Sequence, residues 1–120
     1  MTEKRDKEIT AESLNIVDKA GNTRIKLFVN AEGTPTVSFL DLEGKERLGM
    51  NISEDGTPKI YLSDLEGKVR LAMAIPENGI PSIGFFNSEG KSRLIMGIFE
   101  DGNPFLGFYG PDGKAIRALP

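Results

Sequence analysis

Cysteine, histidine and tryptophan are all absent from the 120-residue chain. Without cysteine there are no disulfides, thiolate metal sites or cysteine nucleophiles, although the redox compartment stays undetermined. Without histidine there is no histidine-dependent triad, and the usual zinc and copper ligands are missing. No stretch matches a phosphate-binding glycine loop. The sequence therefore predicts a protein that is not an enzyme and has no catalytic residues, cofactor or metal.

A basic surface is also lacking, because 15 Lys and Arg are scattered among 18 Asp and Glu, giving a net charge of -3. Such a chain has no cationic field to hold nucleic acid by counterion release. No apolar run approaches the ~20 residues of a membrane-spanning helix, and the first 13 residues are too polar for a secretory signal. We expect a cytoplasmic protein with no membrane span.

Glycine and proline, in contrast, recur with a fixed spacing of 23 residues. Two sets of glycines and one of prolines keep this spacing: Gly33, Gly56, Gly79 and Gly102; Gly21, Gly44, Gly67, Gly90 and Gly113; Pro35, Pro58, Pro81 and Pro104. Self-similarity at a period of this size is typical of repeat proteins. We expect residues 1–13 to form a charged, disordered arm and residues 14–120 to form a single domain of 23-residue repeats.

Within each repeat the apolar residues alternate with period two, which indicates strands rather than helices. The expected strands are Leu14–Val17, Arg24–Val29, Thr36–Leu40, Arg47–Ile52, Lys59–Ser63, Val69–Ile75, Ser82–Phe86, Arg93–Ile98, Phe105–Tyr109 and Ala115–Leu119. Apolar positions change from odd (Val37, Phe39) to even (Leu48, Met50, Ile52) across the turn at Asp41–Gly44, and stay even from Ile52 to Ile60 across the next turn. A four-residue loop at the Asp-x-x-Gly turns and a three-residue loop at the Asp-Gly or Asn-Gly turns would satisfy that register.

These elements predict an all-β fold, an antiparallel meander of about ten strands. Two forms stay open: a closed barrel in which the first strand pairs with the last, or a folded sheet buried by self-association.

The segments Asp41–Arg47 and Asp64–Arg70 share the pattern D-x-x-G-K-x-R, followed by an alternating apolar strand. This pattern resembles tandem β-hairpin repeats of uncharacterised bacterial proteins, over nearly all of residues 14–119. It is also similar in style to tyrosine–aspartate shell repeats and membrane-occupation hairpin repeats. The first would place Tyr before the Asp, where this chain has Leu40, Ser63 and Phe86, and the second would contain Trp. The resemblance implies a repeat fold and transfers no functional residue.

The second face of the predicted sheet combines glycine and alanine with aromatic residues. Small residues on a sheet let large ones, or another layer, approach closely. Two interpretations stay open: packing within one sheet, or contact with another copy in a homo-oligomer. The predicted self-contact residues are Phe28, Leu40, Tyr61, Phe86, Ile95, Phe105 and Tyr109.

Four arginines occupy one slot of successive repeats: Arg24, Arg47, Arg70 and Arg93. They would form a stripe able to bind anionic groups, or each would pair with an acidic turn residue such as Asp41 or Asp64. The acidic turns themselves are explained by turn formation rather than by calcium, since none has the alternating ligands of a calcium loop.

The sequence favours a structural or interaction protein, a self-assembling β-repeat scaffold. The alternative is a small β-barrel that binds an apolar ligand, with Met50, Met73 and Met96 in its lining.

Overall fold

The computed structural model describes residues 7–119, which contain ten β-strands. Their bounds are β1 Ser13–Val17, β2 Thr23–Val29, β3 Pro35–Leu40, β4 Glu46–Ile52, β5 Pro58–Ser63, β6 Val69–Ala74, β7 Ser82–Phe86, β8 Ser92–Ile98, β9 Pro104–Tyr109 and β10 Ala115–Leu119. Each observed bound lies within one residue of the prediction. Period-two alternation between glycine turns is thus enough to locate these strands.

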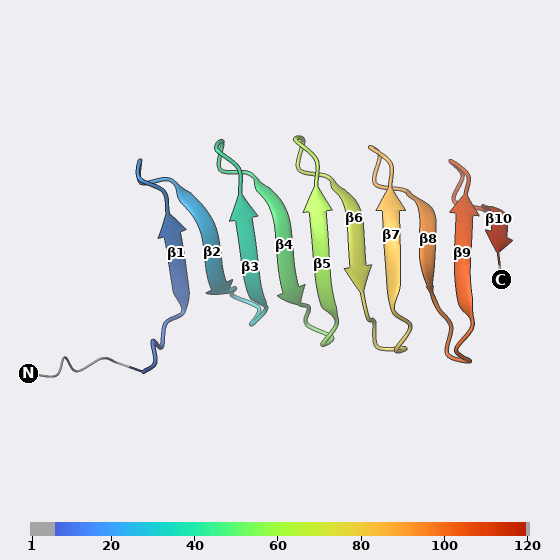
Figure 1. The fold of residues 1–120 in the computed structure, drawn as a ribbon, viewed down its shortest axis with the longest axis horizontal. Coiled ribbons are helices and arrows are strands. Elements are labelled where there is room, and N and C mark those ends of the chain that lie inside the picture. Colours follow the sequence, from blue (N-terminus) through green and yellow to red (C-terminus); the bar gives the residue numbers. More distant parts are fainter. Residues whose placement is uncertain (1–6, 120) are drawn as a thin grey trace, which may run out of the picture.

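The strands form one antiparallel sheet in sequence order, β1 to β10 (Figure 1). This confirms the predicted all-β meander. β1 and β10 lie at opposite edges, and the sheet is not closed, so the barrel form of the prediction is not the form observed. Of the predicted N-terminal arm, residues 1–6 lie outside the described residues. Glu12, at its end, accepts a hydrogen bond from the backbone N–H of Val29 at 3.2 Å.

The turns at both ends of the strands share one geometry. In each, the fourth residue is a glycine with φ between 77° and 88°, and its N–H donates to the carbonyl of the first turn residue. A side-chained residue rarely adopts such a φ, which explains the spacing of the glycines. The predicted difference between four-residue and three-residue loops is therefore wrong.

The register difference comes instead from a β-bulge after each of the turns that end at Gly21, Gly44, Gly67, Gly90 and Gly113. Phe39 pairs with Leu48 and Leu40 with Glu46, so Arg47 is the extra residue. The same slot is skipped at Arg24, Arg70, Arg93 and Ile116. One extra residue moves the following apolar residues back onto the same face.

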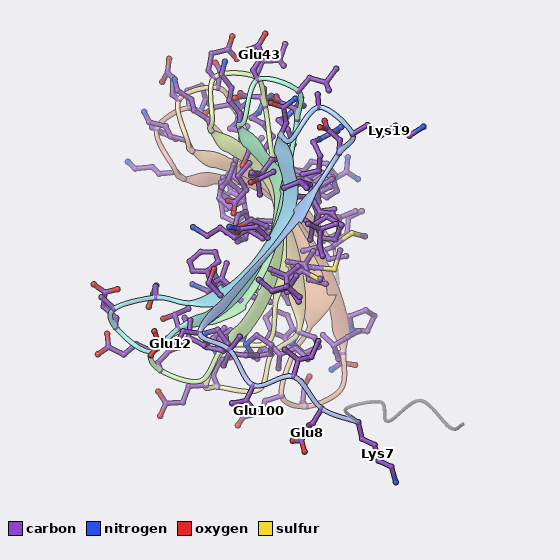
Figure 2. The ribbon with its side chains drawn as sticks, turned by 90° about the vertical axis from the view of Figure 1, so that its left-hand side faces the viewer. Lys7, Glu8, Glu12, Lys19, Glu43 and Glu100 are labelled. Atoms are coloured by element: carbon purple, nitrogen blue, oxygen red, sulfur yellow. The ribbon has the colours of Figure 1, made fainter. Side chains whose placement is uncertain are left out.

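The ten strands form a single layer, and the described part of the chain places no second layer of backbone on either side of it (Figure 2). Among the described residues no hydrophobic side chain is buried. The accessible surface is 9101 Å², whereas a compact 13.1 kDa monomer would expose about 6400 Å². The radius of gyration is 18.6 Å, against about 13.6 Å for a compact chain of this length. Residues 7–119 of the single chain thus form strands and turns without a hydrophobic core.

Candidate functional site: the two faces of the sheet

One face of the sheet, here called the apolar face, carries two rows of cross-strand neighbours that run through all ten strands. The first row is Ile16, Ile25, Phe39, Leu48, Leu62, Leu71, Phe85, Leu94, Phe108 and Arg117; the second is Leu14, Leu27, Val37, Met50, Ile60, Met73, Ile83, Met96, Leu106 and Leu119. Arg117 is the one charged member of either row. The sulfur atoms in Figure 2 lie together on one side of the ribbon.

The apolar face is open to solvent. Leu14 and Ile16 are 44% exposed, and Met73, near the middle of the sheet, is 36% exposed. A groove of about 1150 Å³ follows the second row from Leu14 to Met96 and is bordered by four prolines at or just before the starts of β3, β5, β7 and β9: Pro35, Pro58, Pro81 and Pro104. A contiguous exposed apolar surface of this kind is typical of an interaction surface.

On the opposite face, here called the mixed face, aromatic rings pack over the glycines of the same sheet. The ring of Tyr61 lies over Gly49 on the neighbouring strand, and Phe105 lies over Gly97 in the same way. A Cβ on Gly97 would be 2.8 Å from the Phe105 ring and 2.5 Å from the carbonyl oxygen of Pro81. Phe86 and Tyr109 cover Gly84 and Gly107 of their own strands. Each glycine is therefore explained by packing within one sheet.

The N-terminal half of the mixed face is polar. Ser38 is buried and its hydroxyl donates to the carboxylate of Glu46. Burial, together with the nearby Glu46 carboxylate, raises the pKa of Tyr61 to about 12. The ammonium group of Lys26 lies 4.7 Å from the centre of the Phe28 ring. From β6 onward the same face carries alanine, glycine and isoleucine at the central positions.

The predicted self-contact residues lie on the mixed face, and all of them are half-buried in the single chain. Four of them, Tyr61, Phe86, Phe105 and Tyr109, are the rings that cover glycines. Their contact with another copy stays a prediction. The apolar face, whose rows the sequence places on the inside of a barrel or folded sheet, is the more exposed of the two.

The four predicted stripe arginines share one contact that the sequence did not reveal. Each Nε donates to a backbone carbonyl 16 residues later: Arg24 to Leu40 at 3.0 Å, Arg47 to Ser63 at 2.7 Å, Arg70 to Phe86 at 2.7 Å and Arg93 to Tyr109 at 2.6 Å. Arg24 and Arg70 also lie 3.9 Å and 3.6 Å from the carboxylates of Asp18 and Asp64. The arginines thus tie each bulge to the next hairpin, and anion binding by them stays a prediction.

Three lysines connect successive turns at one end of the strands, those that contain Gly44, Gly67, Gly90 and Gly113. The Nζ atoms of Lys45, Lys68 and Lys91 donate to the carbonyls of Leu65, Ser88 and Pro111, each 20 residues later, at 2.7 to 3.0 Å. The 23-residue spacing of these lysines was visible in the sequence, but their acceptors are backbone atoms that carry no sequence signal.

The acidic turn residues bind their own backbone. Oδ1 of Asp18, Asp41 and Asp64 accepts hydrogen bonds from the N–H groups two and four residues later. These backbone hydrogen bonds lower the pKa of all three carboxyls. Within residues 7–119 no three acidic side chains come together in a way that would hold a metal ion.

Comparison with known proteins gives no match to any protein-family model and no significant match to any curated protein. No helix in the part of the chain that the structure describes is long and apolar enough to span a membrane.

Proposed function

We propose that this protein is a non-catalytic, self-assembling scaffold built from tandem 23-residue hairpin repeats, and that its copies associate through the apolar face. The observation that carries the proposal is the absence of any buried hydrophobic side chain in residues 7–119. Burial of apolar surface is the main favourable term in folding. A single layer therefore gains its stability by covering that surface with another molecule.

The area that the single chain leaves exposed supports a second copy as the covering molecule. Its surface exceeds that of a compact monomer of the same mass by about 2700 Å². Ten strands spaced about 4.8 Å apart, each about 20 Å long, present a face of about 950 Å². Two such faces in contact would bury about 1900 Å², within the range of stable protein interfaces.

The chemistry of the apolar face also favours a like partner. Both rows are uncharged from β1 through β9. A second copy therefore places apolar side chains against them and buries no charged group from these strands in the interface. Two sheets packed face to face about 10 Å apart form a sandwich, in which the row side chains interdigitate.

Two adjacent substitutions on β6 test which face is the contact. Met73→Glu places a carboxylate in the middle of the apolar face, and Ala72→Glu, the matched control, places the same group on the mixed face. We expect Met73→Glu to lower the mass measured by sedimentation equilibrium, because the contact between apolar faces is lost, while Ala72→Glu keeps the assembly. The opposite result would assign the contact to the mixed face, and an unchanged mass for Met73→Glu would contradict the proposal.

A second candidate function is binding of an apolar ligand in the groove of the apolar face, which is large enough for a lipid-sized molecule. Native mass spectrometry of the purified protein distinguishes the two functions. A bound molecule that adds constant mass to each chain favours the ligand, whereas ligand-free oligomers favour the scaffold.

A further inference from the structure

The two edges of the sheet differ in a way that bears on how copies join. β1 has the sequence Ser-Leu-Asn-Ile-Val, with no charge and no proline, and all five of its residues are exposed. Its outer backbone groups have no strand beside them (Figure 1). Exposed edge strands of this composition readily pair with another strand, and natural sheets usually protect them with charged residues.

The opposite edge carries such protection. On β10, Arg117 occupies the place in the first row where β4, β6 and β8 have Leu48, Leu71 and Leu94, and it pairs with Phe108. A strand added to β10 in the register of the meander would bring Ile16 of the next copy beside Arg117. The guanidinium group would then lie between apolar neighbours, at a desolvation cost. Head-to-tail addition of β1 to β10 is disfavoured for this reason.

We infer that β1 is a second self-association surface, at which β1 of another copy pairs antiparallel across a two-fold axis. This inference rests on the proposed self-assembly for its partner but uses a different surface. The backbone N–H of Val29 donates a hydrogen bond to the carbonyl of Glu12. The even-numbered residues of this segment therefore direct their backbone N–H and C=O groups toward β2. Ser13, Asn15 and Val17 consequently direct their N–H and C=O groups outward, because these directions alternate along a strand.

Pairing all five residues places Asn15 opposite its own copy, and Ser13 opposite Val17. The two-fold axis then runs perpendicular to the sheet, so the apolar faces of both copies lie on the same side. Leu14 comes opposite Ile16, which extends the apolar rows across the junction. The product is one continuous sheet of twenty strands whose two ends are both protected by Arg117, so addition stops at two copies.

Glu12 lies opposite Asp18 at each end of this junction. Arg24, 3.9 Å from the Asp18 carboxylate, partly offsets their repulsion. Added salt screens the remaining repulsion between these exposed groups, so the pairing should strengthen rather than weaken with salt.

Single-cysteine variants test the pairing, because the chain has no other cysteine. Facing Cα atoms in a hydrogen-bonded antiparallel pair are about 5.5 Å apart, within the range of about 4.4 to 6.8 Å for a disulfide. We expect Asn15→Cys to form a disulfide-linked dimer under mild oxidation. Ala118→Cys, on the same face of the opposite edge, should stay largely unlinked. Equal linking of both variants would overturn the inference.

Amide hydrogen exchange provides a second measurement on the unsubstituted chain. We expect the outward amides of Asn15 and Val17 to be protected to a similar degree as the inward amides of Leu14 and Ile16. Fast exchange at Asn15 and Val17, with protection at Leu14 and Ile16, would show a free edge. An assembly that persists with a free edge contradicts only the inference, whereas a monomer contradicts the proposed function.

Discussion

Gly97 shows how closely the backbone and the aromatic rings approach on the mixed face. An added Cβ would lie 2.5 Å from a backbone carbonyl oxygen, which has little freedom to move. At Gly84 the nearest atoms are 3.2 Å away and belong to the Phe86 ring, which can turn aside. These two glycines have ordinary φ angles, so the difference between them is one of space.

Gly97→Ala should therefore destabilise the protein by about 1 to 3 kcal/mol, the usual cost of overpacking. Gly84→Ala is the matched control and should cost less, because a small rotation of the ring accommodates the methyl group. Urea unfolding at one fixed chain concentration measures both, since association contributes to apparent stability. Equal stabilities of the two variants would contradict the packing of Phe105 over Gly97.

Among the acidic turn residues, Asp55 has the pKa that is lowered most. Hydrogen bonds from Ser53 and Thr57 lower its pKa from 3.8 to about 2. Because the folded state favours the ionised form, the stabilisation is complete above the ordinary value and is lost as the pH falls through about 2.

We expect carboxyl NMR titration to give Asp55 a pKa near 2, and stability to decline between about pH 4 and pH 2. Asp55→Ala should make this decline shallower without abolishing it, because the pKa values of Asp18, Asp41 and Asp64 are lowered as well. Glu54→Ala, in the same turn, is the control for a change in the turn itself. A measured pKa of 3.8 for Asp55 would show that its hydrogen bonds do not persist in solution.

The β-bulge at the arginine slot distinguishes one kind of hairpin in this sheet from the other. Arg70 illustrates the arrangement: it is the unpaired residue of the β5–β6 hairpin, and its Nε reaches the carbonyl of Phe86 at the end of β7. The contact links two successive hairpins through one side chain. In the β9–β10 hairpin the same slot holds Ile116, which has no guanidinium group to make such a contact.

Arg70→Ala should destabilise the protein by about 1 kcal/mol or less, because the side chain is partly exposed and water can replace it. Arg70→Lys should not restore the loss, since an ammonium group does not reproduce the planar guanidinium geometry. Lys19→Ala, whose side chain extends into solvent (Figure 2), is the control and should be neutral in urea unfolding. Full rescue by lysine would indicate that charge alone matters at this slot.

The strands and turns were predictable because each depends on neighbours in sequence. Alternating apolar residues and the recurring glycines place all ten strands to within one residue. The bulge at Arg47 was not predictable, because a longer loop and a bulge produce the same change of register. The carbonyl partners of the arginines and lysines were missed because any residue type supplies a carbonyl.

At the scale of the whole molecule, sequence patterns indicate which residues share a face but not what covers that face. A sheet closes into a barrel only if β1 and β10 meet. Whether they meet depends on the small twist between neighbouring strands, added up over ten strands. The rows from Leu14 and Ile16 predict one apolar face equally well for a barrel and for an open sheet. The observed sheet is open, and its apolar face is the surface that distinguishes this chain from a compact monomer.

The most direct test of self-assembly is the mass of the unsubstituted chain in solution. Sedimentation equilibrium over micromolar concentrations should give a dimer or a larger closed assembly of the 13.1 kDa chain. A mass of one chain throughout that range, with the strands still formed by circular dichroism and no bound ligand by native mass spectrometry, would contradict it.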